Sequence, residues 1–151
     1  MPKIDISKVF VRQGSGYPAP YNEPVAARLK QGLGDAGGIG DFGVNLTRLP
    51  PGAWSAQRHW HSNEDEFVFV VDGELVLVTD DGEELLRAGE CAAFPKNVPN
   101  GHRLENRTQR TATYLEVGTR TAGDVCSYPD IDLLLARDDG VFCHKDGTPY
   151  R

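Results

Sequence analysis

The feature of this sequence that most limits its fold is the regular interruption of short apolar runs by turn residues. Between residues 42 and 117, apolar and polar residues alternate in short runs, and Gly, Pro, Asn or Asp ends each run. Alternation with period two is typical of half-buried strands, and short strands at spacings of roughly 8–12 residues indicate an antiparallel sandwich or barrel. We therefore expect eight strands, over residues 42–49, 55–61, 66–71, 74–79, 83–87, 91–94, 102–106 and 112–117.

The composition excludes several other classes. Gly and Pro contribute 17 and 10 of the 151 residues, which leaves too few unbroken stretches for a helical bundle, and the length is that of one domain. A formal net charge of −6 without a basic run argues against binding to nucleic acid phosphates. No apolar stretch approaches the ~18 residues of a membrane span. We therefore expect neither nucleic acid nor a membrane among the partners of this chain.

The cysteines and the N-terminus bear on the cellular compartment. Cys91, Cys126 and Cys143 are odd in number and widely spaced, which indicates reduced thiols rather than a disulfide framework. We expect all three to be buried small apolar residues. Because residues 1–6 also lack the apolar core of a secretory signal, the sequence predicts a cytoplasmic location.

Two less regular segments flank the strands. Residues 1–41 are expected to form an N-terminal arm and a short helix, which would run from Asn22 to Gln31. Residues 119–151 are expected to form a C-terminal extension, in which 131–136 could be a helix or a strand. We expect this extension to pack on the barrel core, residues 42–118, or on a partner subunit. Since exposed strand edges are usually covered and most oligomers are symmetric, we also expect a homodimer.

Three of the four histidines fall into one spacing pattern. His59 and His61 are two residues apart in an expected strand, so their side chains point to the same face. Glu66 follows at the start of the next strand, and His102 opens a later strand after a turn. Three imidazole nitrogens and one carboxylate oxygen suit one divalent transition metal, and Zn, Mn, Fe, Ni and Cu are all admissible. Two further acids precede Glu66, so a solvated acidic loop is the alternative interpretation.

The same residues carry a resemblance to a known family. Residues 52–73, with the pattern Gly-(x6)-His-x-His-(x4)-Glu-(x6)-Gly, resemble the first motif of the cupin superfamily. Residues 89–106, with the pattern Gly-(x5)-Pro-(x6)-His-(x3)-Asn, are similar to the second motif. The family usually has Gly two residues after the motif Pro, whereas this chain has Asn97. Asn tolerates a positive φ better than other non-Gly residues, so the turn is expected to survive.

The resemblance implies both a fold and a ligand set. The fold is all-β, a double-stranded β-helix (jelly-roll barrel), with the short N-terminal helix and the C-terminal extension outside it. Carried over position by position, the resemblance implies that His59, His61, Glu66 and His102 are the metal ligands.

Other side chains could contact a small-molecule ligand. Gln57 shares the inward face with the two nearby histidines if the alternation holds, although it could equally be a polar residue at the barrel mouth. Arg48 and Tyr114 could supply further polar contacts, and Tyr114 shares its strand face with Glu116. His144 lies in the extension, away from the motifs, and we expect no functional role for it.

These residues support two main hypotheses of function. The first is a metalloenzyme acting on a small polar molecule, for which the resemblance implies a dioxygenase, a decarboxylase, or a sugar isomerase or epimerase. The second is a non-catalytic small-ligand-binding or sensor module, which would need a separate partner because the chain has no room for a helix-turn-helix segment. A purely structural barrel with vestigial histidines is a third possibility. No general base is visible besides the ligands, so the sequence leaves the reaction open.

Overall fold

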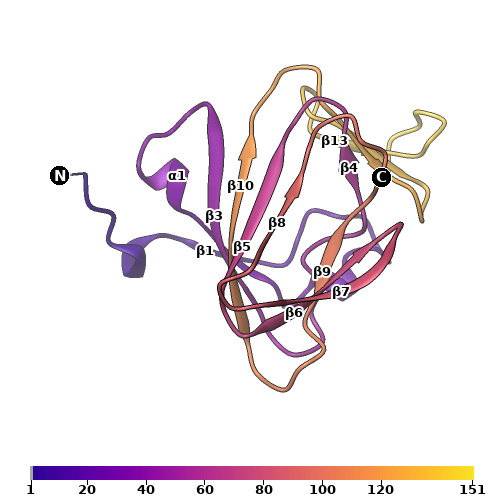
Figure 1. Ribbon diagram of the computed structural model, residues 1–151. Coiled ribbons are helices and arrows are strands. Elements are labelled where there is room, and N and C mark those ends of the chain that lie inside the picture. The colour runs from indigo at the N-terminus through magenta and orange to yellow at the C-terminus, as the bar shows by residue number, and fades with distance from the viewer. Residues whose placement is uncertain (1) are drawn as a thin grey trace.

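The computed structural model describes residues 2–151, and strands account for most of its regular structure (Figure 1). Its helical elements are two 3-10 turns, at Ile6–Lys8 and Glu23–Val25, and one α-helix, α1, at Leu33–Ala36. No helix within residues 2–151 is long and apolar enough to cross a membrane. The strands are β1 (Val11–Gln13), β2 (Leu29–Gly32), β3 (Phe42–Leu49), β4 (Trp60–His61), β5 (Glu66–Asp72), β6 (Glu74–Thr79), β7 (Gly82–Arg87), β8 (Cys91–Phe94), β9 (Arg103–Glu105), β10 (Ala112–Thr119), β11 (Val125–Tyr128), β12 (Leu133–Ala136) and β13 (Val141–Cys143).

The strands form three antiparallel sheets. The largest has the order β1-β2-β3-β10-β5-β8, and its strands β3, β10, β5 and β8 lie side by side in Figure 1. A three-stranded sheet, β7-β6-β9, lies across the lower part of that view, and a four-stranded sheet, β13-β12-β11-β4, carries the C-terminal extension. The all-β class and the jelly-roll arrangement expected from the sequence are confirmed.

The hydrophobic core lies on the inner face of the six-stranded sheet. Along β5, Val68 and Val70 are buried and the residues between and beside them are exposed, so the strand alternates with period two. Val70 pairs with the fully buried Tyr114 of β10. Because Glu66 lies two residues before Val68, it shares this inner face and brings a carboxylate into the interior. The core residues contributed by the three-stranded sheet are Leu75, Leu77, Leu86 and Leu104.

The predicted strand over residues 55–61 is wrong except at its end, where Trp60–His61 forms β4. The preceding residues touch the β9 segment at two single bridges, from Trp54 to Glu105 and from His59 to His102. Their backbone groups are satisfied at these crossing points, where the Ser55 amide donates to a carbonyl of β9 and the His59 and His102 backbones exchange hydrogen bonds. The other predicted strands lie within one or two residues of observed ones.

The predicted helix from Asn22 to Gln31 is confirmed only in its first turn. Beyond Val25 the chain becomes extended, and β2 pairs with β3, with Leu29 opposite Arg48. A segment of this length is only marginally stable as an isolated helix, whereas pairing with β3 satisfies its backbone groups. Tertiary pairing therefore overrides the local helix signal.

The C-terminal extension packs on its own chain. Strand β11 pairs with β4, with Cys126 opposite His61. Tyr128 of β11 packs edge-on against Tyr17 of the N-terminal arm, with ring centroids 5.6 Å apart. Within the run at 131–136, expected to be a helix or a strand, Leu133–Ala136 forms strand β12. The N-terminal arm and the C-terminal extension thus contact each other at β11, the strand that pairs with β4 and His61.

Arg58 fixes the extension to the barrel. Its guanidinium donates to both carboxylate oxygens of Asp130, at 2.8 and 2.7 Å, and also contacts Asp80 in the turn after β6. Such two-pronged pairs are stronger than single ion pairs. The hydrogen bonds from Arg58 hold the pKa of Asp130 below its usual value.

The three cysteines are all free, but the expectation that each is buried is wrong for two of them. Cys126 is buried in β11, whereas Cys91 is exposed and Cys143 is partly exposed. Cys91 begins β8, which is an edge strand of the six-stranded sheet, and its partner there is the exposed Phe69 of the outer face.

The turn between β5 and β6 provides a test of the fold. Gly73 has a φ of +84°, and a Cβ at this position would lie 2.9 Å from the Cα of Ala112. Gly89 has a similar φ of +89° but open space around it. We expect Gly89→Ala to lower the free energy of unfolding by about 1–2 kcal/mol, the cost of a left-handed conformation. Gly73→Ala is expected to lower it further, because β10 must also move. Urea unfolding measures both values, and equal losses would contradict the predicted clash.

Candidate metal centre

The four candidate ligands converge because the segment of His59 and His61 pairs with the segment of His102 and is joined to Glu66 by a short loop. His59 and His102 are backbone partners, with His102 N donating to His59 O at 2.9 Å and the reverse bond at 3.2 Å. Partners in an antiparallel pair present their side chains on the same face, and the two rings lie 4.5 Å apart. His61 lies two residues further along, and Glu66 begins β5 after a short loop.

The imidazoles surround the Glu66 carboxylate. The Nε2 atom of His102 is 2.8 Å from Glu66 Oε2, and that of His59 is 3.5 Å from the same oxygen. The Nε2 atom of His61 is 3.3 Å from the other oxygen, Oε1. All four side chains are largely buried, with exposures between 9 and 17%.

Two of the histidines have their orientation fixed through Nδ1. The Nδ1 atom of His59 lies 2.8 Å from the backbone carbonyl of Gln57, and that of His61 lies 2.7 Å from Oδ2 of Asp124. Both partners accept hydrogen bonds, so each Nδ1 carries the proton and each Nε2 faces Glu66. This is the arrangement in which a histidine offers Nε2 to a metal while its other nitrogen is held by an acceptor.

The Glu66 carboxylate shows that the site fits a cation. Its Oε2 atom is buried without a hydrogen-bond partner, although His102 Nε2 is only 2.8 Å away. The two atoms are therefore close without the alignment of a good hydrogen bond. Nitrogen donors and a carboxylate oxygen in one buried group suit a divalent transition metal.

The four residues do not form one mutual group. Donor atoms of His59, Glu66 and His102 all lie within 4.8 Å of one another. His61 reaches this group through Glu66 Oε1 and also belongs to two other groups. The partners in those groups are Cys126 with His59, and Glu64 with Asp124.

The charges of the site are strongly coupled. Burial lowers the pKa of His59, but its electrostatic interactions with the neighbouring Cys126 and Glu66 outweigh burial and raise it to about 9. His61 has the same opposing causes, and its pKa is raised to about 12. Burial favours the neutral form of Glu66, yet the imidazoles hold its pKa well below the usual value. Burial, with the charge of His59, lowers the pKa of His102. Without a cation, protons on His59 and His61 therefore balance the carboxylate.

A cavity of about 170 Å³ adjoins the four side chains. Tyr114 and Glu116 line it from β10, and Lys30 lines it from β2. The strand register explains this placement, because Glu116 pairs with Val68 and Tyr114 pairs with Val70 on the same inner face as Glu66. The sequence left open which face of β10 points inward, and it is the face of Tyr114 and Glu116.

The structure places the other two candidate contact residues outside the cavity lining. Gln57 is buried, but its side-chain amide donates to the backbone carbonyl of Tyr21 at 2.8 Å. Its backbone carbonyl, rather than its side chain, serves the site by accepting from His59. Arg48 donates from Nη1 to Oε1 of Gln31 at 2.8 Å. In this structure both side chains contact local partners, and the contact of Gln57 and Arg48 with a ligand stays a prediction.

Sequence reasoning missed the contribution of the C-terminal extension. Asp124 is 2% exposed and receives hydrogen bonds from His61 Nδ1 and from the Asn63 amide. Glu64, one of the two acids that precede Glu66, is 7% exposed and accepts a hydrogen bond from the Thr121 amide. Cys126 lines the cavity beside them. No spacing signal in the sequence links residues 124 and 126 to the histidines, since β4 and β11 meet only in the folded chain.

Comparison with known proteins agrees with this geometry. The model of the cupin domain family matches residues 45–118. A crystal structure from Silicibacter pomeroyi, described as a sugar phosphate isomerase from a cupin superfamily, is 47% identical to this chain. The match covers 99% of this chain and 97% of that one, with a TM-score of 0.93. The chain belongs to the cupin superfamily.

Other solved structures are more distant. A putative sugar phosphate isomerase from Acidithiobacillus ferrooxidans is 29% identical over 92% of this cupin and 86% of that chain, with a TM-score of 0.77. A predicted oxalate decarboxylase from Thermotoga maritima is 18% identical over 79% of this cupin and 99% of that chain, with a TM-score of 0.61, and shares the fold. No curated protein matches this cupin.

The departure from the second cupin motif is accommodated by the backbone. Asn97 has a φ of 59° and is the one non-glycine residue with a positive φ among residues 2–151. Its amide donates to the backbone carbonyl of His61 at 2.8 Å. The turn expected from the sequence is therefore retained, and it supports the strand that carries His61.

Removal of the Asp124 charge tests the support of His61. Asp124→Asn can no longer hold the Nδ1 proton of His61 as strongly, so we expect zinc affinity to fall about 10- to 100-fold. Titration against a competing chelator measures this change. Asp132→Asn is the matched control, because Asp132 contacts His144 Nδ1 at the same 2.7 Å distance outside the site. Equal affinities in the two variants would contradict the assigned role.

Proposed function

We propose that this cupin is a divalent-metal-binding enzyme that interconverts the aldose and ketose forms of a short-chain sugar phosphate. The observation that carries the proposal is the similarity, over nearly the whole of both chains, to the Silicibacter pomeroyi protein described as a sugar phosphate isomerase. The Acidithiobacillus ferrooxidans protein, described as a putative enzyme of the same kind, adds support.

The metal would be held by His59, His61, Glu66 and His102. When bound, a divalent ion supplies Lewis acidity toward the carbonyl and hydroxyl oxygens of a sugar. The buried Glu66 oxygen without a hydrogen-bond partner supports this ligand set. Zn, Mn, Fe, Ni and Cu all remain candidates on the evidence of these four residues alone.

We assign proton transfer to Glu116. Lys30 Nζ and Asn45 Nδ2 contact its Oε1 atom at 3.3 and 3.2 Å, which leaves Oε2 for the substrate. Burial favours the neutral acid, but the charge of Lys30 outweighs burial and holds the pKa of Glu116 below its usual value. The carboxylate is therefore ionised at neutral pH. It can accept the proton from C2 of an aldose and return it to C1, while a second proton passes from the C2 hydroxyl to the carbonyl oxygen, so no oxidant or reductant is consumed.

Tyr114 supplies a hydroxyl for recognition. Its side chain is fully buried, it lines the cavity, and its Oη atom has no hydrogen-bond partner. Burial raises the pKa of Tyr114 well above its usual value, so the group stays a neutral donor. A sugar hydroxyl or carbonyl would satisfy it, and a buried polar group left without a partner is costly.

The size and charge of the cavity favour a short anionic substrate. Arg28 and Lys30 bring positive charge to the lining of the cavity. A phosphate group would complement that charge. The volume of about 170 Å³ lies below the roughly 300–1,000 Å³ of pockets for drug-sized ligands, which favours a short carbon chain.

Isomerisation in D₂O tests the proposal. Metal-loaded protein is incubated with three- to six-carbon aldose phosphates, and proton NMR follows ketose formation and deuterium uptake at the transferred carbon. We expect turnover with at least one substrate and its loss in EDTA. Glu116→Gln is expected to lower the rate about 10²- to 10⁴-fold, as for the loss of a general base, with unchanged metal content. Glu83→Gln is the control, since Glu83 is exposed and pairs with Arg107.

Other outcomes of the same assays would replace the isomerase proposal. Oxygen consumption would indicate a dioxygenase, and CO₂ release from a small carboxylic acid would indicate a decarboxylase. Ligand binding that raises the melting temperature without turnover would favour the non-catalytic binding or sensor module. Purified protein that takes up no metal would favour a structural barrel.

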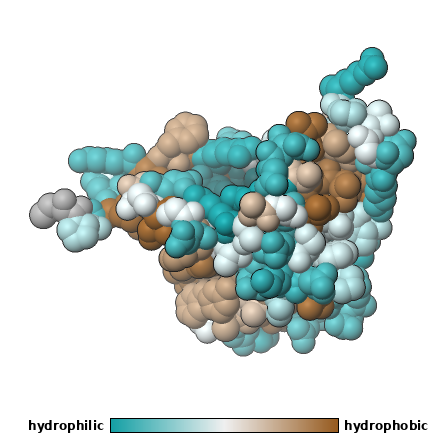
Figure 2. Space-filling view, turned by 90° about the horizontal axis from the view of Figure 1, so that it is seen from above, coloured by the Kyte–Doolittle hydropathy of each residue, from teal (hydrophilic) through white to brown (hydrophobic). Residues whose placement is uncertain are grey.

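We also propose that the protein is cytoplasmic and forms a homodimer. Its three cysteines are free, which suits a reducing compartment. The outer face of the six-stranded sheet exposes Phe67, Phe69 and Val71 at 38, 38 and 51%, and Phe10 of the N-terminal arm is 81% exposed. Figure 2 shows apolar side chains on the side of the molecule that carries this arm. Exposed apolar surface of this kind often marks an interface between proteins.

Light scattering after size exclusion tests the dimer. We expect a particle of twice the 16.5 kDa chain mass. The double variant Phe67→Ser, Phe69→Ser is expected to elute as a monomer with an unchanged circular dichroism spectrum. Leu85→Ser, which changes an even more exposed apolar residue of the three-stranded sheet, should remain dimeric. A monomeric wild type would contradict the homodimer.

A further inference from the structure

Cys126 lies on the same face as the candidate ligands, but on a strand outside the cupin motifs. It is in β11, directly opposite His61 of β4 in the antiparallel pair. Cross-strand partners present their side chains to the same side, so the thiol is directed where the His61 ring is directed. Residue 126 also lies beyond the match to the family model, which ends at residue 118.

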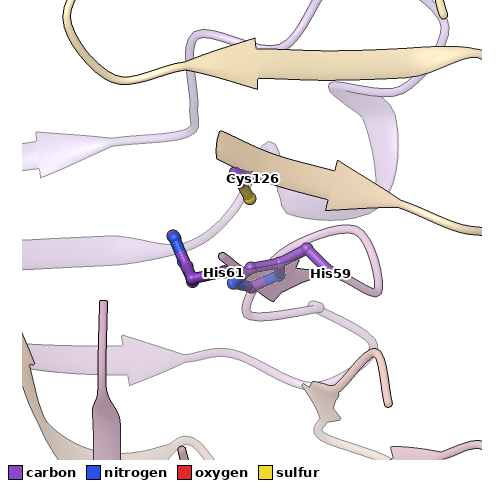
Figure 3. A group of neighbouring side chains, drawn as sticks. All are labelled: His59, His61 and Cys126. Atoms are coloured by element: carbon purple, nitrogen blue, oxygen red, sulfur yellow. The ribbon is translucent and has the colours of Figure 1, made fainter. Parts of the chain in front are cut away.

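The sulfur is close enough to take part in metal binding. A ring nitrogen of His59, a ring nitrogen of His61 and the Sγ atom of Cys126 all lie within 4.8 Å of one another. Figure 3 shows the sulfur pointing from its strand toward the two imidazoles. Cys126 is 3% exposed and lines the same cavity as Glu66 and His102.

His59 belongs to two overlapping donor groups. One contains Glu66 and His102, and the other contains His61 and Cys126. Because the groups share His59, the two sets of donors adjoin at this histidine. Cys126 also belongs to the apolar cluster with Tyr128 and Leu133, but its sulfur lines the cavity and faces the two imidazoles.

We propose that Cys126 is a metal ligand, which joins His59 and His61 on the side of the site that the C-terminal extension covers. The thiol binds as the thiolate, and its proton is released to solvent. Thiolate donors favour Zn, Fe or Cu, whereas Mn prefers oxygen donors. The proposal therefore makes Mn the least suitable of the five candidate metals. It rests on the metal-binding part of the proposed function and not on the isomerase reaction.

X-ray absorption of the zinc-loaded wild-type protein is the first test, because it needs no variant. We expect sulfur in the zinc shell at about 2.3 Å beside nitrogen and oxygen at about 2.0–2.2 Å. A shell of nitrogen and oxygen alone would overturn the assignment of Cys126 and leave the isomerase proposal intact. Failure to bind any metal would overturn both.

Cobalt substitution with matched variants is the second test. The wild-type protein loaded with Co²⁺ is expected to show sulfur-to-cobalt charge-transfer absorption in the near ultraviolet, and Cys126→Ser should lose it. In Cys126→Ser, zinc affinity should fall at least about tenfold, because mutation of residues that only support a ligand already causes a loss of this size. Manganese affinity should change less. Cys91→Ser, an exposed site on β8, should keep the band. Identical spectra and affinities in wild type and Cys126→Ser would overturn the proposal. If Cys126→Ser does not fold, the absorption data on the wild type decide.

Discussion

The Glu66 carboxylate, buried among three imidazoles, is the constraint on which the rest of the site depends. An isolated buried carboxylate is costly, so its neighbours must supply positive charge. The Nδ1 protons of His59 and His61 are held by Gln57 O and Asp124, which leaves only Nε2 to face the carboxylate. Either extra protons or a cation must therefore fill the space between them. Metal binding at this site would therefore exchange protons for an ion, and its strength would depend on pH.

The C-terminal extension explains how this charge balance is kept out of water. Strand β11 pairs with β4. It carries the thiol of Cys126, and the residue before it, Asp124, contacts His61 Nδ1. Arg58 holds the extension in place through Asp130, and Tyr17 of the N-terminal arm packs against Tyr128. A barrel reduced to the family-matched residues would lack these groups. The segments outside the cupin motifs are thus part of the candidate site, because they pair with the strand that carries His61 and supply the Asp124 contact to its ring.

The sequence predicted what depends on local pattern and missed what depends on long-range pairing. Alternation along β5 and β10, with the turn residues between strands, was sufficient for the all-β class. The spacing of His59, His61 and Glu66 was sufficient to expect that they converge. The segment Leu29–Gly32 has a helical sequence pattern. It forms a strand because it pairs with β3, and its local sequence does not show this pairing. Asp124 was missed for the same reason, since a buried partner of a histidine has no signature in the spacing of residues.

Glu66 and Glu116 show how one inner face can give two carboxylates different tasks. Both are ionised, because imidazoles surround Glu66 and Lys30 accompanies Glu116. Glu66 has both oxygens directed at ring nitrogens, so it is committed to whatever cation the histidines share. Glu116 has its Lys30 and Asn45 contacts on one oxygen, so the other remains available for a proton. The strand register places them within one cavity, since Glu66 and Val68, the partner of Glu116, are successive inward residues of β5. A site in which Glu66 faces the histidines and Glu116 keeps one oxygen free could hold a cation and accept a substrate proton without rearranging the barrel.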